Sequence, residues 1–242
     1  MSFGRSAKKA PIRAAVAPTK SRVRLMWGKT ARYKYMSHLD NLRTLERAIR
    51  RSDIPIAYSQ GFNPSMKLSF GPPLPLGFTS ETEVVDITLD TNVMPYMIDN
   101  IKKVLPEGIY IVDSRVVFTK AKSISSLLNR VIYTLPFKET WNESDLNDKV
   151  TALLDRQTLE IERVGKSETK VVDIRPGIYD LKVENDLLVL TMGVGDGGYV
   201  RPSELLRLLT EDDDSAYLAY LVHRKEMYRV DENGEKIHPM DL

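Results

Sequence analysis

The order of strand-like and helix-like segments is the feature that most constrains how this chain of 242 residues folds. Residues 23–36 alternate apolar and basic side chains, which is typical of a half-buried strand. Residues 37–53 place Leu39, Leu42 and Leu45 at helical spacing behind a serine suited to the N-cap. The segments that follow predict two strands, a helix and a strand, over residues 56–70, 83–89, 92–105 and 109–118.

The same order returns in the second half of the chain. The pattern predicts a strand, a helix, one or two strands and a further strand, over residues 131–137, 142–156, 159–183 and 187–192. A helix then begins at Arg201-Pro-Ser-Glu204, where proline suits the first turn. Residues 216–230 close the series as a helix or a strand.

This repeated order indicates an α+β protein made of two tandem ferredoxin-like modules, each with a sheet covered by two helices. We expect the modules over residues 22–119 and 130–230, with a basic disordered tail over 1–21 and a frayed C-terminus over 231–242. The predicted core of the first module comprises apolar residues of its first helix and central strand: Leu39, Leu42, Leu45, Val85, Ile87 and Leu89.

Charge is divided unevenly along the chain. Residues 1–51 contain 14 basic and 2 acidic residues, a net charge of +12, whereas residues 52–242 contain 21 basic and 31 acidic residues, a net charge of −10. A basic segment of this kind is a typical footprint for a polyanion such as RNA. A solubilising tail or an organelle transit peptide would explain the same segment without nucleic acid.

The composition excludes several classes of chemistry. The chain contains no cysteine, so it has no disulfide framework, thiolate zinc site, iron–sulfur cluster or cysteine nucleophile. The three histidines, His38, His223 and His238, are too scattered to indicate a metal site, and we expect no cofactor. No apolar run reaches the roughly 18 residues of a membrane span. We therefore predict a cytoplasmic protein that does not engage membranes.

The start of the first predicted helix carries a candidate site. His38 and Asp40 fall in its first turn, beside backbone N–H groups that suit an anion. Basic residues precede the helix and recur along one of its faces: Lys34, Arg43, Arg47 and Arg50. One interpretation is a phosphate-binding edge with an imidazole that transfers protons. The other is a capped helix with a packed histidine and solvated arginines.

Residues 58–67, Tyr-Ser-Gln-Gly-Phe-Asn-Pro-Ser-Met-Lys, form the most irregular segment of the chain. Aromatic rings offer faces for base stacking, and a neighbouring lysine offers a charge for phosphates. The candidate RNA-binding residues of this segment are Tyr58, Gln60, Phe62, Asn63 and Lys67. A wide turn between two strands, with Phe62 folded inward, is the structural alternative.

A glycine-rich turn, Gly193-Val-Gly-Asp-Gly-Gly198, precedes the helix that begins near Arg201. Such a turn can cradle a phosphate. Its spacing follows neither the dinucleotide-binding pattern nor the Walker A loop. A hairpin or a helix entry explains these glycines more simply.

Four segments together resemble the radical-SAM-linked protein family, also known as DUF2344: Tyr35-Met-Ser-His-Leu-Asp40, Leu45-Glu-Arg-Ala-Ile-Arg-Arg51, Pro55-Ile-Ala-Tyr-Ser-Gln-Gly-Phe-Asn-Pro64 and Lys67-Leu-Ser-Phe-Gly-Pro-Pro-Leu-Pro-Leu-Gly77. The resemblance is dense over residues 22–90. It implies a companion of radical SAM proteins in bacterial RNA or ribosome biology. Because this chain has no cysteine for the three-thiolate cluster, a separate enzyme would supply that chemistry.

From these observations we expect an RNA- or ribonucleoprotein-binding accessory protein that acts with a radical SAM protein supplied in trans. Two alternatives remain open. The duplicated modules and the glycine-rich turn are similar, more distantly, to RAMP proteins that process CRISPR RNA. By that analogy the chain is a metal-independent endoribonuclease, with His38 as general acid or base and Arg43 or Arg47 on the scissile phosphate. The other alternative is a protein-docking subunit that never touches nucleic acid.

Overall fold

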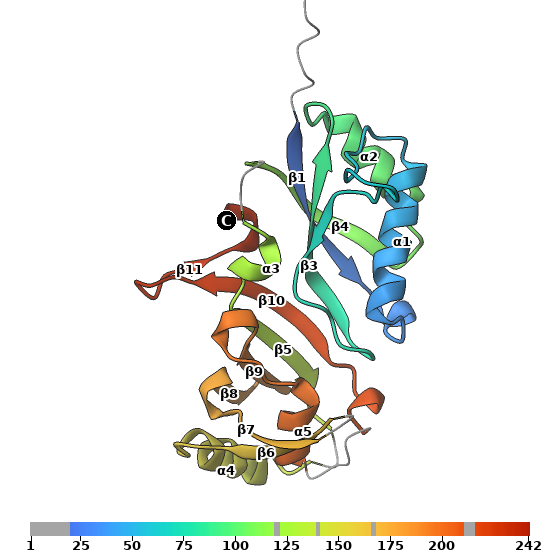
Figure 1. Cartoon of the computed structure of the whole chain (residues 1–242). Coiled ribbons are helices and arrows are strands. Elements are labelled where there is room, and N and C mark those ends of the chain that lie inside the picture. Colours follow the sequence, from blue (N-terminus) through green and yellow to red (C-terminus); the bar gives the residue numbers. More distant parts are fainter. Residues whose placement is uncertain (1–19, 119–121, 139–140, 166–167, 211–215) are drawn as a thin grey trace, which may run out of the picture.

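The computed structural model describes residues 20–118, 122–138, 141–165, 168–210 and 216–242 (Figure 1). The first half contains, in chain order, β1 (Ser21–Lys29), α1 (His38–Arg51), β2 (Leu68–Phe70), β3 (Thr79–Leu89), α2 (Pro95–Val104) and β4 (Ile109–Val117). The second half contains α3 (Ile124–Leu127), β5 (Arg130–Pro136), α4 (Glu143–Leu154), β6 (Glu160–Val164), β7 (Thr169–Asp173), β8 (Ile178–Glu184), β9 (Leu187–Gly193), α5 (Pro202–Thr210), β10 (His223–Val230) and β11 (Lys236–Ile237).

Within these residues, nine strands form one continuous sheet in the order β4-β1-β3-β10-β5-β9-β8, with β2 paired to β3 and β11 paired to β10. The first half has the strand order β4-β1-β3-β2, and the second half has the equivalent order β10-β5-β9-β8, so that, with β6, β7 and β11 left out of the count, both read fourth, first, third, second. The β6–β7 hairpin, inserted between α4 and β8, forms a separate two-stranded sheet. All strand pairs are antiparallel except β3 with β10. The predicted α+β class is confirmed.

The expectation of two separate sheets is wrong. The β2 strand is only three residues long and pairs with Val85, Asp86 and Ile87 on β3. The beginning of β3 therefore keeps a free edge. The β10 strand pairs there in parallel, His223 opposite Thr79 and Arg224 opposite Ser80, and merges the two halves into one sheet.

Two apolar cores lie against this sheet. Helices α1 and α2 cover one face of the first half, where Val23, Leu25 and Trp27 of β1 point toward them. Helices α4 and α5 lie together at the other end of the molecule (Figure 1) and pack on the second half. No helix in the described part of the chain is long and apolar enough to cross a membrane.

Helix α1 begins where the sequence predicts, at the Ser37 cap. The Ser37 hydroxyl accepts the backbone N–H of Asp40 at 3.2 Å, which is one of the two bonds of a capping box, and donates to the Asp40 carboxylate at 2.7 Å. The buried stripe of the helix contains Asn41, Leu45, Ala48 and Ile49. Leu42 is only half-buried and Leu39 is 60% exposed, so the predicted burial of these two leucines is wrong. The stripe is rotated from the expected one because Asn41, rather than Leu39, faces the sheet.

Val85, Ile87 and Leu89 of β3 are buried as expected. The expectation of a frayed C-terminus is wrong, because residues 236–242 pack on the sheet face opposite α1 and α2. The Arg24 Nη1 atom donates to the carbonyl oxygens of Pro239, at 2.6 Å, and Leu242, at 2.9 Å. Arg24 is itself buried and paired with Asp86, so the last residues satisfy the rest of a buried guanidinium. Most of the predicted tail, residues 1–19, lies outside the described residues.

Candidate functional site

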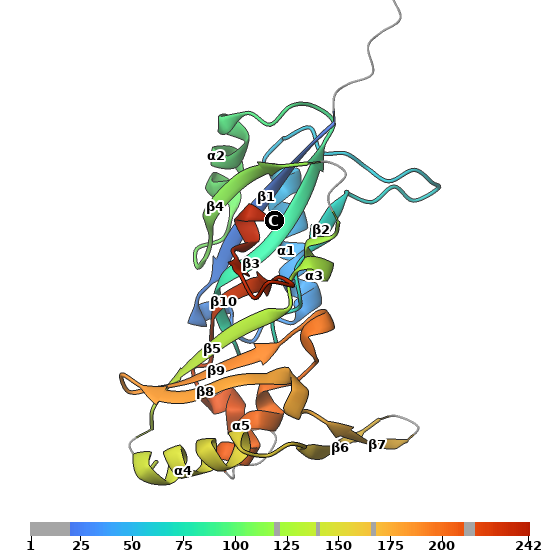
Figure 2. The ribbon, with the colours of Figure 1, turned by 90° about the vertical axis from the view of Figure 1, so that its left-hand side faces the viewer.

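Residues 58–67, called the tongue from here on, form a narrow hairpin-like projection (the teal hairpin that extends from the upper half in Figure 2). Tyr58 bridges to Met66, and the Ser59 N–H donates to the Ser65 carbonyl at 2.8 Å. The tip turns at Gly61, whose φ of +139° favours glycine. The backbone of the tongue is therefore ordered by its own hydrogen bonds.

All five tongue residues predicted to bind RNA are exposed: Tyr58, Gln60, Phe62, Asn63 and Lys67. The Phe62 side chain is 100% exposed, so the alternative in which it folds inward is wrong. Phe62 therefore offers an open aromatic ring at the tip of the tongue, on which a base could stack.

The predicted basic residues around α1 occupy two places. Arg43, Arg47 and Arg50 lie on the solvent face of the helix, called the arginine face from here on, and Arg43 is 3.6 Å from the Asp40 carboxylate. Lys34 lies before the helix, where its ammonium sits 4.9 Å from the centroid of the Tyr35 ring and its carbonyl accepts the Gly77 N–H. The arginine face offers three charges at one-turn spacing for a polyanion.

His38 is half-buried and lines a small pocket with the polar side chains of Asn41 and Glu83 and with apolar groups that include Trp27. It is called the polar pocket from here on, after those three polar side chains. Burial lowers the pKa of the His38 imidazole below its usual value, the Glu83 charge opposes that shift, and the Arg224 charge adds to it. The imidazole is therefore neutral near pH 7. The cavity measures about 10 Å³, which is the size of a water molecule rather than of an organic ligand.

Two buried polar atoms of residues that line this pocket, Trp27 Nε1 and Asn41 Oδ1, lack a hydrogen-bond partner within the described chain. The same holds for the buried Lys29 Nζ, two residues beyond Trp27 on β1. Burial lowers the pKa of Lys29 to about 8, the Glu83 charge raises it, and the Arg224 charge lowers it further. A buried, unpaired ammonium destabilises the fold. The pocket is therefore a place where polar groups interrupt the apolar core of the first half.

Glu83 and Arg224 connect the polar pocket to the junction of the two halves. Arg224 is buried and donates to Glu83 Oε1 at 2.9 Å and to the Tyr133 hydroxyl at 2.8 Å. Its Nη1 and Nη2 atoms also donate to the carbonyl oxygens of Pro72, at 2.9 Å, and Pro73, at 2.8 Å. One guanidinium from β10 thus fixes the backbone of the proline-rich segment.

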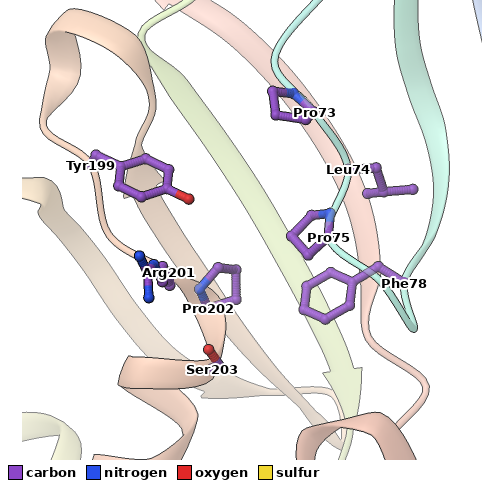
Figure 3. Close-up of a pocket in the computed structure, with 8 residues that line it drawn as sticks. All are labelled: Pro73, Leu74, Pro75, Phe78, Tyr199, Arg201, Pro202 and Ser203. Carbon is purple, nitrogen blue, oxygen red and sulfur yellow. The ribbon is translucent and has the colours of Figure 1, made fainter. Parts of the chain in front are cut away.

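That segment forms one wall of a groove between the two halves, called the proline groove from here on. Figure 3 shows Pro73, Leu74, Pro75 and Phe78 on one side and Tyr199, Arg201, Pro202 and Ser203 on the other. The outer cavity measures about 200 Å³. An inner cavity of about 240 Å³ adjoins it and reaches Tyr133 and Arg224 on the sheet.

The glycine-rich turn ends as predicted in a helix, α5, with Pro202 in its first turn. Its glycines are explained by close packing. A Cβ atom on Gly193 would collide with the carbonyl of Gly197, and one on Gly197 would collide with the carbonyl of Asn129. Gly195 and Gly198 have φ values of +55° and +86°. The absence of side chains in this turn lets its backbone pack closely against itself and against Asn129, the residue before β5.

Two groups of functional candidates were not found from the sequence. The buried charges Lys29, Glu83 and Arg224 stand at the ends of strand-like segments, where charge is ordinarily solvated. A charged residue at the end of a strand-like segment was their only signal in the sequence. The proline groove gave no such signal, because it joins residues more than 100 positions apart. The described residues contain no group of three histidine, aspartate or glutamate side chains that could hold a metal ion.

Comparison with known proteins identifies one family. Its model, described as "Uncharacterized protein conserved in bacteria (DUF2344)", matches residues 22–202. No curated protein matches the chain. Among solved structures, a candidate glycine cleavage system transcriptional repressor is 10% identical, with a TM-score of 0.23, over 87% of this chain and 98% of that one.

Proposed function

The chain belongs to the DUF2344 family of bacterial proteins, and we propose that it is an RNA- or ribonucleoprotein-binding accessory protein that acts with a separate radical SAM enzyme. The observation that carries this proposal is the tongue, which presents a fully exposed Phe62 at its tip and exposed Tyr58 and Lys67 at its base. Rings for stacking next to a cation are the elements of single-strand recognition.

The charge distribution supports the same function. The arginine face is solvent-exposed and belongs to residues 1–51, which carry a net charge of +12 and of which Arg24 and Lys29 are buried away from a ligand. Neutralising phosphates releases counterions from a nucleic acid, so such a segment drives association with RNA. The acidic remainder of the chain, with a net charge of −10, steers the first encounter with an RNA toward the basic segment.

The catalytic alternative has less support. His38 is half-buried, and within the described residues its imidazole forms no hydrogen bond with a second group that would orient it. A general base must lie within hydrogen-bond reach of the substrate hydroxyl, and it needs a partner that stabilises its protonated form.

We also propose that the two halves are ferredoxin-like modules that are merged through β3 and β10. Both halves have the strand order of that fold, β4-β1-β3-β2 in the first half and β10-β5-β9-β8 in the second.

The test is the salt dependence of RNA binding by the full chain, measured by fluorescence anisotropy with a labelled single-stranded RNA. If about five phosphates are neutralised, log affinity should fall against log salt with a slope of roughly −3 to −4. Deletion of residues 1–20 should flatten that slope while the circular dichroism spectrum stays unchanged. Absence of binding at low salt would overturn the RNA proposal and leave the protein-docking function.

The radical SAM part of the proposal needs its own experiment. An affinity-tagged chain, expressed in its native cells, should co-purify with a radical SAM protein, identified by mass spectrometry. A variant with Phe62→Ala and Arg47→Ala serves as the matched control for RNA-bridged association. Recovery of RNA without any radical SAM protein would remove the partner and keep RNA binding.

A further inference from the structure

The proline groove has walls that are fixed before any ligand binds. On one side, Arg224 holds the carbonyl oxygens of Pro72 and Pro73. On the other side, the Arg163 Nη2 atom donates to the Tyr199 carbonyl at 3.0 Å. Each guanidinium is itself held by a glutamate. A rigid groove loses little conformational entropy when a ligand enters it, which favours affinity.

The lining of the groove suits a flat ring. Pro73, Pro75, Tyr199 and Pro202 line both the outer and the inner cavity, so the two cavities lie side by side along these residues. The Tyr199 side chain is 60% exposed and stands across the gap from the prolines (Figure 3). Flat apolar surfaces on both sides, with the hydroxyls of Ser125 and Ser203 at the edges, match the shape of an unpaired base.

The charge at the mouth suits an anion attached to that ring. Arg163 and Arg201 share one carboxylate, because Glu204 is 2.7 Å from Arg163 Nε and 3.7 Å from Arg201 Nε. One positive charge therefore remains in excess, and the Arg201 side chain that carries it is 54% exposed. Among the described residues that line the two cavities, none is an aspartate or a glutamate.

We infer that the proline groove binds one unstacked nucleotide of a single-stranded RNA, with its base against Tyr199 and its phosphate at Arg201. This inference rests on the proposed RNA-binding function and adds a second contact region to the tongue. Two hairpins, the tongue and β6–β7, project from the same side of the molecule, the right-hand side of Figure 2. Along the vertical axis of that view, the glycine-rich turn lies below the tongue and above the β6–β7 hairpin. An RNA strand bound at the tongue thus has a path along this side to the groove.

The test compares matched variants of the full chain by anisotropy with a labelled single-stranded RNA. Tyr199→Ala should weaken binding about 5- to 150-fold, the effect of losing one base–aromatic stack, whereas Tyr199→Phe should bind as the wild type does. Tyr96→Ala, which removes an exposed tyrosine of α2, is the control. Arg201→Ala should flatten the salt slope, whereas Arg156→Ala, at an exposed arginine after α4, should not.

Crosslinking of the wild-type chain to RNA that contains 4-thiouridine gives a readout that needs no variant. Peptides that span Tyr199–Ser203 should carry the adduct, as should peptides from the tongue. If Phe62→Ala weakens binding while Tyr199→Ala does not, and no adduct maps to the groove, the inference is overturned and the RNA-binding function stands. If the wild type binds no RNA, both are overturned.

Discussion

Arg224 Nη1 lies 2.9 Å from Glu83 Oε1, and both side chains are buried, with exposures of 1% and 8%. The two residues come from β10 and β3, the strands that join the halves of the sheet. The same guanidinium fixes the proline-rich wall of the groove, and the same carboxylate lines the polar pocket beside His38. This ion pair therefore belongs at once to the β3–β10 junction, to the wall of the proline groove and to the lining of the polar pocket, so that its loss should disturb all three.

Removing one partner of this pair should destabilise the fold strongly. Arg224→Met leaves the Glu83 carboxylate buried without its partner, so we expect a loss of about 3–5 kcal/mol in the free energy of unfolding. Urea denaturation followed by circular dichroism measures this loss. Lys102→Met, which breaks an exposed pair with Asp99, is the control and should cost about 0–1 kcal/mol. Equal losses in the free energy of unfolding for the two substitutions would contradict a stabilising role of the buried Arg224–Glu83 pair.

The buried Lys29 should make stability depend on alkaline pH. Its pKa is about 8 in the folded chain and has the ordinary lysine value of 10.5 once the chain unfolds, so between these values the unfolded chain binds more protons at this site. The contribution of Lys29 to stability should therefore rise with pH over this window, by at most about 1.4 kcal/mol per pH unit. Lys29→Met removes that rise. Parallel stability profiles of wild type and variant from pH 8 to 10.5 would show that Lys29 is not perturbed.

Phe62→Ala should weaken binding to single-stranded RNA by about 1–3 kcal/mol through the loss of one stacked base. Because Phe62 is fully exposed, the free energy of unfolding should change by less than about 0.5 kcal/mol. Phe118→Ala removes another exposed phenylalanine, outside the tongue, and is the matched control. Anisotropy titrations at one salt concentration measure the three affinities, and an unchanged Kd for Phe62→Ala would count against the tongue as a stacking surface.

Arg47→Ala should act through a phosphate rather than a base. Loss of one phosphate contact should reduce the steepness of the salt slope by about 0.7 for a single strand and should weaken all RNA sequences alike. Titrations of two unrelated sequences at several salt concentrations measure both properties. The exposed Arg156, on the second half, provides the control substitution to alanine. A sequence-dependent loss would assign Arg47 to base recognition instead.

His38→Ala should leave RNA binding unchanged. Because burial keeps the imidazole neutral near pH 7, the substitution removes no charge, and neither affinity nor salt slope should shift. Purified wild-type protein should leave a labelled RNA intact on a denaturing gel, with or without a chelator. Cleavage that follows wild-type His38 through purification and disappears in His38→Ala would establish the ribonuclease alternative, since a general acid or base acts on the transition state.

The local elements of the first half could be predicted because their signals are local. Ser37 and Asp40 cap α1 through atoms three residues apart, and the alternation of Val85, Ile87 and Leu89 marks the buried face of β3. The error at Leu39 has the same origin. Helical spacing alone allowed more than one stripe, and contact with the sheet selected the one that contains Asn41. The exposure of the tongue also agrees with its irregular, polar sequence.

What the sequence determined by itself is thus the order of the strands and helices, their caps and most of their buried faces, since these depend on residues a few positions apart. Only the tertiary structure decided that β10 pairs with the free beginning of β3, that Glu83 and Arg224 meet in the interior, and that Pro73 and Tyr199 face each other across a groove. These contacts join residues more than 100 positions apart. Their formation depends on which strand edges remain unpaired and which surfaces meet after both halves have folded.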